Sequence, residues 1–145
     1  MSVVNEFRLT VESRSVNEAF CRTVVSAFIT PLDPTIEEVN DLKTAVSEAV
    51  TNAIVHGYKD ACGKIYIDGK ILKNNTVSIR IKDNGVGIPD VKLAMQPLYT
   101  TGGSDRAGLG FTVMQSFCDR VSVTSTENKG TAVTLTKRIV GKKAW

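Results

Sequence analysis

Cysteine, histidine and aromatic residues are all scarce in this sequence of 145 residues. The three cysteines, Cys21, Cys62 and Cys118, are odd in number and form no Cys-x-x-Cys pair, which argues against a zinc site or a disulfide framework. No apolar run reaches the roughly 18 residues that a membrane span needs, and the first residues lack the charged-then-apolar order of a signal peptide. We therefore expect a cytoplasmic protein with reduced thiols and no membrane partner.

Excess positive charge is also absent over most of the chain. The formal net charge is +3, but Lys137, Arg138, Lys142 and Lys143 supply four positive charges near the C-terminus, so the remaining residues carry a net charge of −1. Without a basic face before residue 137, direct binding to nucleic acid is a poor interpretation. We expect a single domain over residues 1–145, in which about 137–145 form a solvated basic tail.

The hydrophobic pattern predicts paired strands and three longer helices. Alternation of period two predicts strands at 7–11, 65–67, 77–81, 121–123 and 133–135, and helical spacing predicts helices at 16–28, 36–57, 91–95 and 109–117. Ser15 with Glu18, and Thr35 with Glu38, have the spacing of a capping box at a helix start. Because hairpins dominate, we expect an α+β fold, a two-layer α/β sandwich whose mixed, mostly antiparallel sheet is covered by helices on one face.

The predicted helix at 36–57 carries the first chemical signal. Its second half is apolar almost all round, so it should be buried, yet Glu48 and Asn52 lie on one side of it at i and i+4. Burying a carboxylate without partners costs several kcal/mol, so Glu48 either borders a cleft or is paired. On spacing alone, a Glu at the helix edge and an Asn bonded to the backbone is the simpler interpretation. His56, one further turn along, is expected to satisfy a helix-end carbonyl rather than to act in catalysis.

A glycine-containing segment follows the predicted strand at 77–81. In Asp83-Asn84-Gly85-Val86-Gly87-Ile88, the carboxylate could accept a hydrogen bond from a ring amine while bare backbone approaches the ring closely. The same residues are also typical of an ordinary turn.

A second glycine-rich segment runs from residue 99 to 110 and leads into the predicted helix at 109–117. Free amides at Gly108 and Gly110, at the start of a helix, favour phosphate binding. Arg106 and the hydroxyls of Thr100 and Thr101 could add hydrogen bonds to phosphate oxygens. A mobile surface loop with a helix cap is the competing interpretation.

The three motifs, in this order and at these distances, resemble the Bergerat-fold ATP-binding superfamily of gyrase and histidine kinases. The resemblance sharpens in the stretches 15–22, 44–58, 96–101 and 107–112, which look like the sporulation anti-sigma-F family of stand-alone serine kinases. The match covers about residues 7–137. It implies the same α+β fold, with ATP and magnesium bound beneath a lid at about 96–107.

The resemblance implies two activities and assigns residues to them. A member of that family binds and inhibits a sigma factor, and it phosphorylates a serine of a small anti-anti-sigma protein. Glu48 would be the catalytic carboxylate, and Asn52 would bind ATP through a magnesium ion that bridges the phosphates. Arg22 lies in a stretch that resembles the partner-binding surface, although an exposed arginine on a helix face needs no such role. A homodimer is implied by the resemblance alone.

The resemblance also assigns the other ATP contacts by motif position. Asp83 would accept from the adenine amino group, with Gly85, Gly87 and Ile88 beside it. The remaining ATP contacts would come from Thr100, Thr101, Arg106, Gly108, Leu109 and Gly110.

Two other functions stay open. A general-stress-type anti-sigma kinase would share the catalytic residues and differ in its partners. A nucleotide-dependent sigma-binding module would use ATP only to shape its surface, and the complete pair of Glu48 and Asn52 argues against it.

Overall fold

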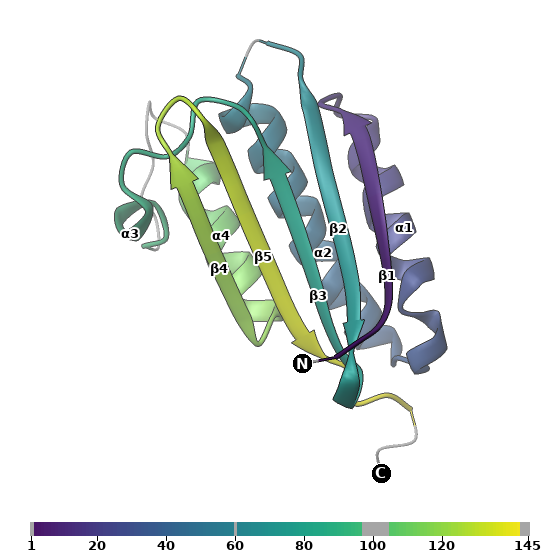
Figure 1. Cartoon of the computed structure of the whole chain (residues 1–145). Coiled ribbons are helices and arrows are strands. Elements are labelled where there is room, and N and C mark those ends of the chain that lie inside the picture. The colour runs from purple at the N-terminus through teal and green to yellow at the C-terminus, as the bar shows by residue number, and fades with distance from the viewer. Residues whose placement is uncertain (1, 60, 97–104, 143–145) are drawn as a thin grey trace.

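A five-stranded sheet forms one layer of the structure and helices form the other (Figure 1). The computed structural model describes residues 2–59, 61–96 and 105–142, with backbone alone at 105–109. Its elements are β1 (Val3–Glu12), α1 (Asn17–Phe28), η1 (Thr30–Leu32), α2 (Ile36–Asn52), η2 (Ala53–Gly57), β2 (Lys64–Leu72), η3 (Lys73–Asn75), β3 (Thr76–Asp83), α3 (Val91–Ala94), α4 (Asp105–Phe117), β4 (Arg120–Thr126) and β5 (Gly130–Arg138). No helix in these ranges combines the length and hydropathy needed to cross a membrane.

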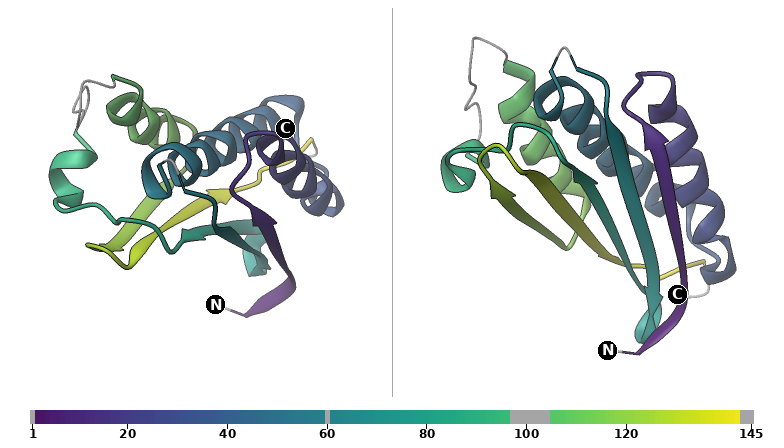
Figure 2. Two further views of the ribbon diagram at one scale, coloured as in Figure 1. Left: turned by 90° about the horizontal axis from the view of Figure 1, so that it is seen from above. Right: turned by 45° about the horizontal axis from the view of Figure 1, so that its top comes forward.

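The sheet has the strand order β1-β2-β3-β5-β4. All four pairings of the described strands are antiparallel, so the expected mixed sheet is wrong in that detail. The two-layer α+β sandwich itself is confirmed. Helices α1, α2 and α4 lie on the same face of the sheet (Figure 2).

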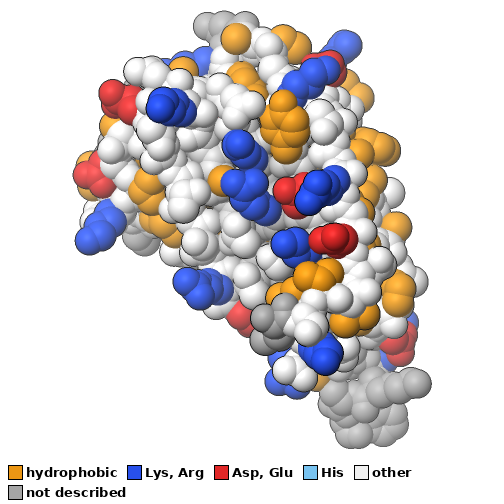
Figure 3. All heavy atoms as spheres, viewed as in Figure 1, with side chains coloured by type: hydrophobic (Ala, Val, Ile, Leu, Met, Phe, Trp, Pro, Cys, Tyr) orange, Lys and Arg blue, Asp and Glu red, His pale blue; other side chains and the backbone are white. Residues whose placement is uncertain are grey.

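The core lies between the sheet and these helices, because the central strands β2 and β3 alternate between buried and more exposed residues. Ile65 and Ile67 of β2 are fully buried, as are Val77 and Ile79 of β3. Helix α2 supplies the centre of the other layer with Val46, Ala49 and Val50, none of which is more than 2% exposed. None of the helices that the structure describes covers the opposite face of the sheet, which carries many Lys and Arg side chains (Figure 3).

The two predicted capping boxes have different outcomes. At α2 the Thr35 hydroxyl accepts from the Glu38 amide at 3.1 Å and the Glu38 carboxylate accepts from the Thr35 amide at 2.9 Å, as predicted. At α1 the prediction is wrong, because the N-cap is Val16 and no side chain caps it. The Glu18 carboxylate instead accepts from Arg22 and Thr51, each at 3.1 Å.

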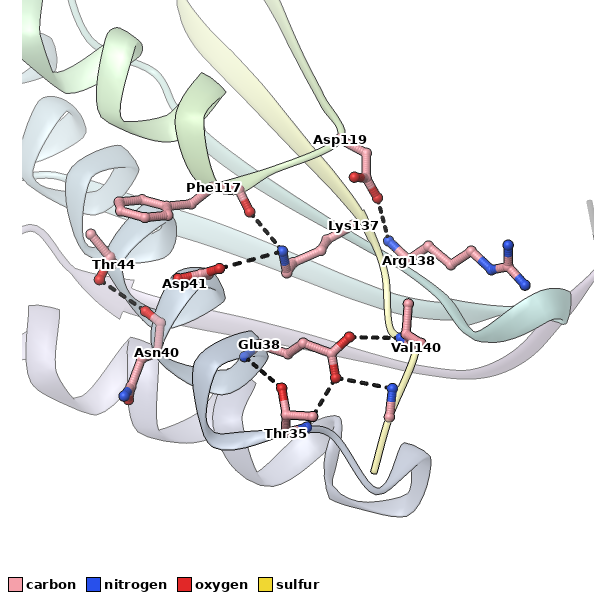
Figure 4. A network of polar contacts seen from close by, with 11 residues as sticks. Thr35, Glu38, Asn40, Asp41, Thr44, Phe117, Asp119, Lys137, Arg138 and Val140 are labelled. Carbon is pink, nitrogen blue, oxygen red and sulfur yellow. Dashed lines mark hydrogen bonds and ion pairs between the residues drawn. The ribbon is translucent and has the colours of Figure 1, made fainter. Parts of the chain in front are cut away.

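The predicted basic tail from residue 137 is also wrong for the described residues. Lys137 belongs to β5, donates to the carbonyl of Phe117 at 2.9 Å, and has Nζ 3.8 Å from Asp41 Oδ2 (Figure 4). The Glu38 carboxylate accepts from the amides of Val140 at 2.7 Å and Gly141 at 3.0 Å. The chain therefore stays bound to the start of α2, because alternation in β5 directs Lys137 toward the helices rather than to solvent.

Glu38 thus caps α2 and also binds the segment that follows β5. Burial raises the pKa of its carboxyl group, but the amides of Thr35, Val140 and Gly141 outweigh burial, and the net pKa is lowered. A carboxylate held by several amide donors stabilises the folded state as long as it is ionised.

Helix α4 begins at Asp105, four residues before the predicted start. Ala107 and Leu109 are good helix formers, and Asp105 is a favourable first residue because of the helix dipole. These preferences outweigh the two glycines, which had suggested a loop.

Candidate functional site

A pocket of about 480 Å³ lies where the end of α2, the end of β3, the start of α4 and the turn between β4 and β5 meet. This volume is typical of pockets that take small molecules, roughly 300–1,000 Å³. The lining residues come from several elements: Asn52, His56, Gly57, Lys59, Asp83, Val86, Gly87, Ile88, Pro89, Asp90, Ala94, Phe111, Glu127, Asn128 and Thr131. Four predicted site residues, Asn52, Asp83, Gly87 and Ile88, are among them.

Asp83 is the buried acid of this pocket, with 5% of its surface exposed. Its Oδ1 accepts from the Gly85 amide at 2.8 Å. Burial raises the pKa of the Asp83 carboxyl, and the amides of Gly85 and Thr131 offset only part of this effect. Gly57 leaves space for the Asp83 carboxyl group, because a Cβ at position 57 would lie 2.8 Å from that group. Asp83 is therefore a desolvated acceptor that can bind an amino group of a ligand.

The glycines after Asp83 are required by contacts inside the protein. A Cβ at Gly85 would lie 2.0 Å from the carbonyl oxygen of Gly57, which itself accepts from the Val86 amide at 2.9 Å. Gly87 has φ of +77°, and a Cβ there would lie 2.3 Å from the carbonyl oxygen of Thr126. The sequence suggested that the bare backbone of these glycines approaches the ring of a ligand, and that role stays a prediction. The close contacts that the structure shows are with Gly57 of η2 and with Thr126 at the end of β4.

Three residues that the sequence analysis missed hold this loop in place. The Tyr58 hydroxyl accepts from the Asn84 amide at 2.9 Å and donates to the carbonyl of Lys64. The Ile88 amide donates to Ser125 Oγ at 2.7 Å, and the Asn128 amide donates to the carbonyl of Val86 at 2.6 Å. The loop that borders the pocket is thus fixed on both sides.

Glu48, Asn52 and Gly110 lie together where α4 packs against α2. A Cβ at Gly110 would lie 3.3 Å from the amide atoms of Asn52 and 3.4 Å from Glu48 Oε2. Asn52 lines the pocket, and Glu48 lies one helical turn before it. Helix periodicity brings both side chains to one side of α2, as predicted.

Asn52 has a buried polar atom that could bind a ligand. Its Nδ2 is buried and has no hydrogen-bond partner among the residues that the structure describes. A buried donor left unpaired costs about 1–3 kcal/mol, which a phosphate oxygen at this position would recover. The described ranges hold no cluster of three or more acidic, thiol or imidazole groups for a metal. The Asn52 amide oxygen suits a magnesium ion that arrives with phosphates, because Mg²⁺ takes few protein ligands beside substrate oxygens.

For several predicted site residues the structure does not describe the side chain. Thr100 and Thr101 lie outside the described residues, and only the backbone of Arg106, Gly108 and Leu109 is described, within α4. Because an α-helix leaves only the amides of its first turn free, a helix that begins at Asp105 does not present the Gly110 amide at its end. The phosphate-binding roles of these residues therefore stay predictions.

Arg22 lies on α1, away from the residues that line the pocket. Its guanidinium donates to Glu18 at 3.1 Å and to Ser47 Oγ at 3.4 Å, and its side chain is 39% exposed. This places it on the surface formed by α1 and α2. His56 lines the pocket from η2, one turn beyond Asn52.

Comparison with known proteins agrees with this arrangement. A family model for the histidine kinase-like ATPase domain matches residues 10–137. An anti-sigma F factor from Thermoanaerobacter sp. (strain X514) is 52% identical over 144 residues, 99% of this chain and 100% of that protein. Anti-sigma F factors from Caldanaerobacter subterraneus subsp. tengcongensis and Bacillus subtilis (strain 168) are 54% and 47% identical, and each match covers 96–97% of this chain and 97% of the relative.

Two solved structures share the fold. The crystal structure of the RsbU and RsbW domains of a Mycobacterium tuberculosis protein matches with a TM-score of 0.67 and 17% identity, over 94% of this chain and 32% of that one. A blue-light activated histidine kinase from Erythrobacter litoralis matches with a TM-score of 0.61 and 19% identity, over 88% of this chain and 43% of that one. The chain thus spans less than half of either structure. These two structures agree with the fold. The family model and the full-length relatives show that the chain belongs to the histidine kinase-like ATPase domain family and, within it, to the anti-sigma F factors.

Proposed function

We propose that this chain is an anti-sigma factor with ATP-dependent protein-serine kinase activity. In this proposal it binds and inhibits a sporulation sigma factor and phosphorylates a serine of an anti-anti-sigma protein, as a cytoplasmic homodimer. The observation that carries the proposal is the unpaired Nδ2 of Asn52, buried in a pocket that also holds Asp83, with Glu48 one turn away. The names of the full-length relatives support the sigma factor as a partner.

In this proposal different residues would bind the nucleotide and assist phosphoryl transfer. Asp83 would hold the amino group of adenine, and Asn52 would hold phosphate and magnesium. Bound ATP and magnesium would supply the phosphoryl group and neutralise its charge. Phosphoryl transfer otherwise needs alignment and a group that orients or deprotonates the incoming hydroxyl, and in this proposal Glu48 would do this for a serine.

A single substitution at Glu48 tests the proposal. Glu48→Gln keeps the shape of the side chain but removes its basicity. It should reduce label transfer from ATP to the anti-anti-sigma protein by about 10²–10⁴-fold, the usual contribution of a general base. ATP affinity should stay close to that of the wild type. Glu37→Gln is the matched control, because Glu37 is an exposed carboxylate on the same helix. Transfer at the wild-type rate in Glu48→Gln would remove Glu48 from the catalytic role.

The same assay separates the alternatives. ATP binding without any label on the partner favours a nucleotide-dependent binding module. Transfer to the antagonist of a general-stress sigma factor, and not to a sporulation antagonist, favours the general-stress kinase.

A further inference from the structure

Helix α1 packs along α2, and a polar cluster joins the two helices (Figures 1 and 2). Oε2 of Glu18, on α1, accepts from the Thr51 hydroxyl of α2 at 3.1 Å. Oε1 of the same carboxylate accepts from Arg22 at 3.1 Å, and Arg22 also donates to Ser47 Oγ of α2 at 3.4 Å. A carboxylate only accepts and a guanidinium only donates, so the direction of each bond is settled. The proposed phosphoryl transfer leaves Thr51 and Ser47 without a role.

The cluster holds the part of α2 that lies beside the site residues. Thr51 directly precedes Asn52, and Ser47 directly precedes Glu48. Residues four apart share one side of a helix, so α1 is bonded to one stripe of α2. The adjacent stripe, about 100° further round the helix, carries Glu48 and Asn52. A rotation of this part of α2 therefore moves both stripes together.

The position of the Asn52 side chain depends on how the last turn of α2 is held. The α-helix ends at Asn52 and the π-helical turn η2 begins at Ala53, where the Tyr58 amide donates to the Ala53 carbonyl at 3.0 Å. A π turn closes one residue later than an α turn, so it does not continue the α-helical bonding. Asn52 Nδ2 has no hydrogen-bond partner in the part of the chain that the structure describes. The backbone of α2, and the contacts that hold it, thus set where this amide group lies.

The Thr51 hydroxyl is used differently from that of Thr44 on the same helix. Thr44 Oγ1 donates to the carbonyl of Asn40, four residues earlier, at 2.8 Å (Figure 4). Helical threonines commonly make such a bond to their own helix. Thr51 instead donates to a carboxylate on α1, so its hydroxyl joins two helices. Thr44 therefore offers a matched control for any substitution at Thr51.

We propose that Thr51 is a positioning residue for Asn52, and that the Glu18 carboxylate of α1 is the anchor through which it acts. A helix has a radius of about 5–6 Å with its side chains, so a rotation of about 10° moves a side-chain atom by about 1 Å. A displacement of this size at a reacting centre can slow a reaction by about 10²-fold. Helix α1 thus sets the geometry of the pocket, although the residues that line the pocket come from other elements. This inference rests on the proposed function and adds the contact that places its magnesium-binding residue.

Equilibrium binding of two ligands to the full chain tests this role. Thr51→Val keeps the size and branching of the side chain but removes the donor to Glu18. The Kd for ATP with excess magnesium should rise at least about fivefold, the equivalent of one hydrogen bond. The Kd for adenosine should keep its wild-type value, because adenosine has no phosphates and binds no magnesium. Thr51→Ser keeps the hydroxyl and should restore the Kd for ATP.

The control and the contrary results follow from the same two measurements. Thr44→Val should change neither Kd, since the Thr44 hydroxyl bonds within α2. If Thr51 only supports the fold, Thr51→Val weakens ATP and adenosine by the same factor. That result, or an unchanged Kd for ATP, overturns the inference.

A second variant removes the anchor and decides the matter if Thr51→Val does not fold. Glu18→Ala takes away the acceptor of the same bond, so it should raise the Kd for ATP with magnesium and leave that for adenosine unchanged. Where both variants fold, the double variant should bind ATP no more weakly than Glu18→Ala alone. Additive losses would mean that the two residues act separately, which overturns the inference. Absence of ATP binding in the wild type, in contrast, contradicts the proposed function itself.

Discussion

Replacing Asp83 with Asn separates the binding role of this carboxylate from its effect on stability. The substitution keeps the shape of the side chain, which matters because a Cβ on neighbouring Gly57 would already lie 2.8 Å from the carboxyl group. The amide oxygen of Asn can still accept from Gly85. The amide nitrogen, however, presents a donor to the pocket where the carboxylate presented an acceptor.

The expected effects on ATP and on folding have opposite signs. A donor facing the adenine amino group leaves both groups unpaired, at a cost of about 1–3 kcal/mol, so the Kd for ATP should rise about 5- to 150-fold. The pKa of Asp83 is raised by burial above its ordinary value of 3.8, so the ionised carboxylate destabilises the folded state at neutral pH. Asp83→Asn should therefore unfold at the same or a higher denaturant concentration.

Calorimetric titration with ATP and urea unfolding without nucleotide measure the two effects. The stability advantage of Asp83→Asn should shrink as the pH falls through the raised pKa, because the wild-type carboxyl becomes neutral as well. An unchanged Kd for ATP would remove Asp83 from the adenine site. A large loss of stability at pH 7 would mean that the buried charge supports the fold, contrary to this reasoning.

Three further substitutions test other parts of the structure. Gly87→Ala should abolish ATP binding, since φ of +77° and a Cβ 2.3 Å from a carbonyl oxygen force the loop to move; nucleotide titration checks this. Glu38→Gln should lower the unfolding free energy by about 1–2 kcal/mol at pH 7. This loss should disappear as the pH falls below 4.5 through the lowered pKa of Glu38, and urea unfolding at several pH values measures it. Gly110→Ala should raise helix stability but slow label transfer, because its Cβ would contact Asn52 at 3.3 Å.

Local patterns in the sequence were enough to predict most of the fold. The order of strands and helices follows from apolar periodicity, and the capping box of Thr35 and Glu38 forms as predicted. The equivalent pattern at Ser15 fails because the Glu18 carboxylate is bound by Arg22 on the same helix and by Thr51 on α2, which is distant in sequence. The basic residues after 136 looked like a tail because the pattern does not show that Asp41 of α2 lies beside Lys137, or that the Glu38 carboxylate accepts from the amides of Val140 and Gly141.

The candidate site was predictable only where its residues fall into motifs. Asn52 and Asp83 both line the pocket, as their motifs indicated. Tyr58 and Ser125 carried no such signal, because each bonds to a loop residue that is distant in the chain. Tyr58 lies 26 positions from its partner, and Ser125 lies 37 from Ile88. Such pairs become visible only when the sheet brings the strand ends together.

This pocket is proposed to bind ATP and to transfer its terminal phosphate beside Glu48. The most direct measurement incubates the purified chain with magnesium and radiolabelled ATP, with and without a candidate anti-anti-sigma protein, and locates the label. Serine-bound label on the partner with the wild type, and its loss in Glu48→Gln with ATP binding intact, is the predicted result. Failure of the wild-type chain to bind ATP at all would contradict the account.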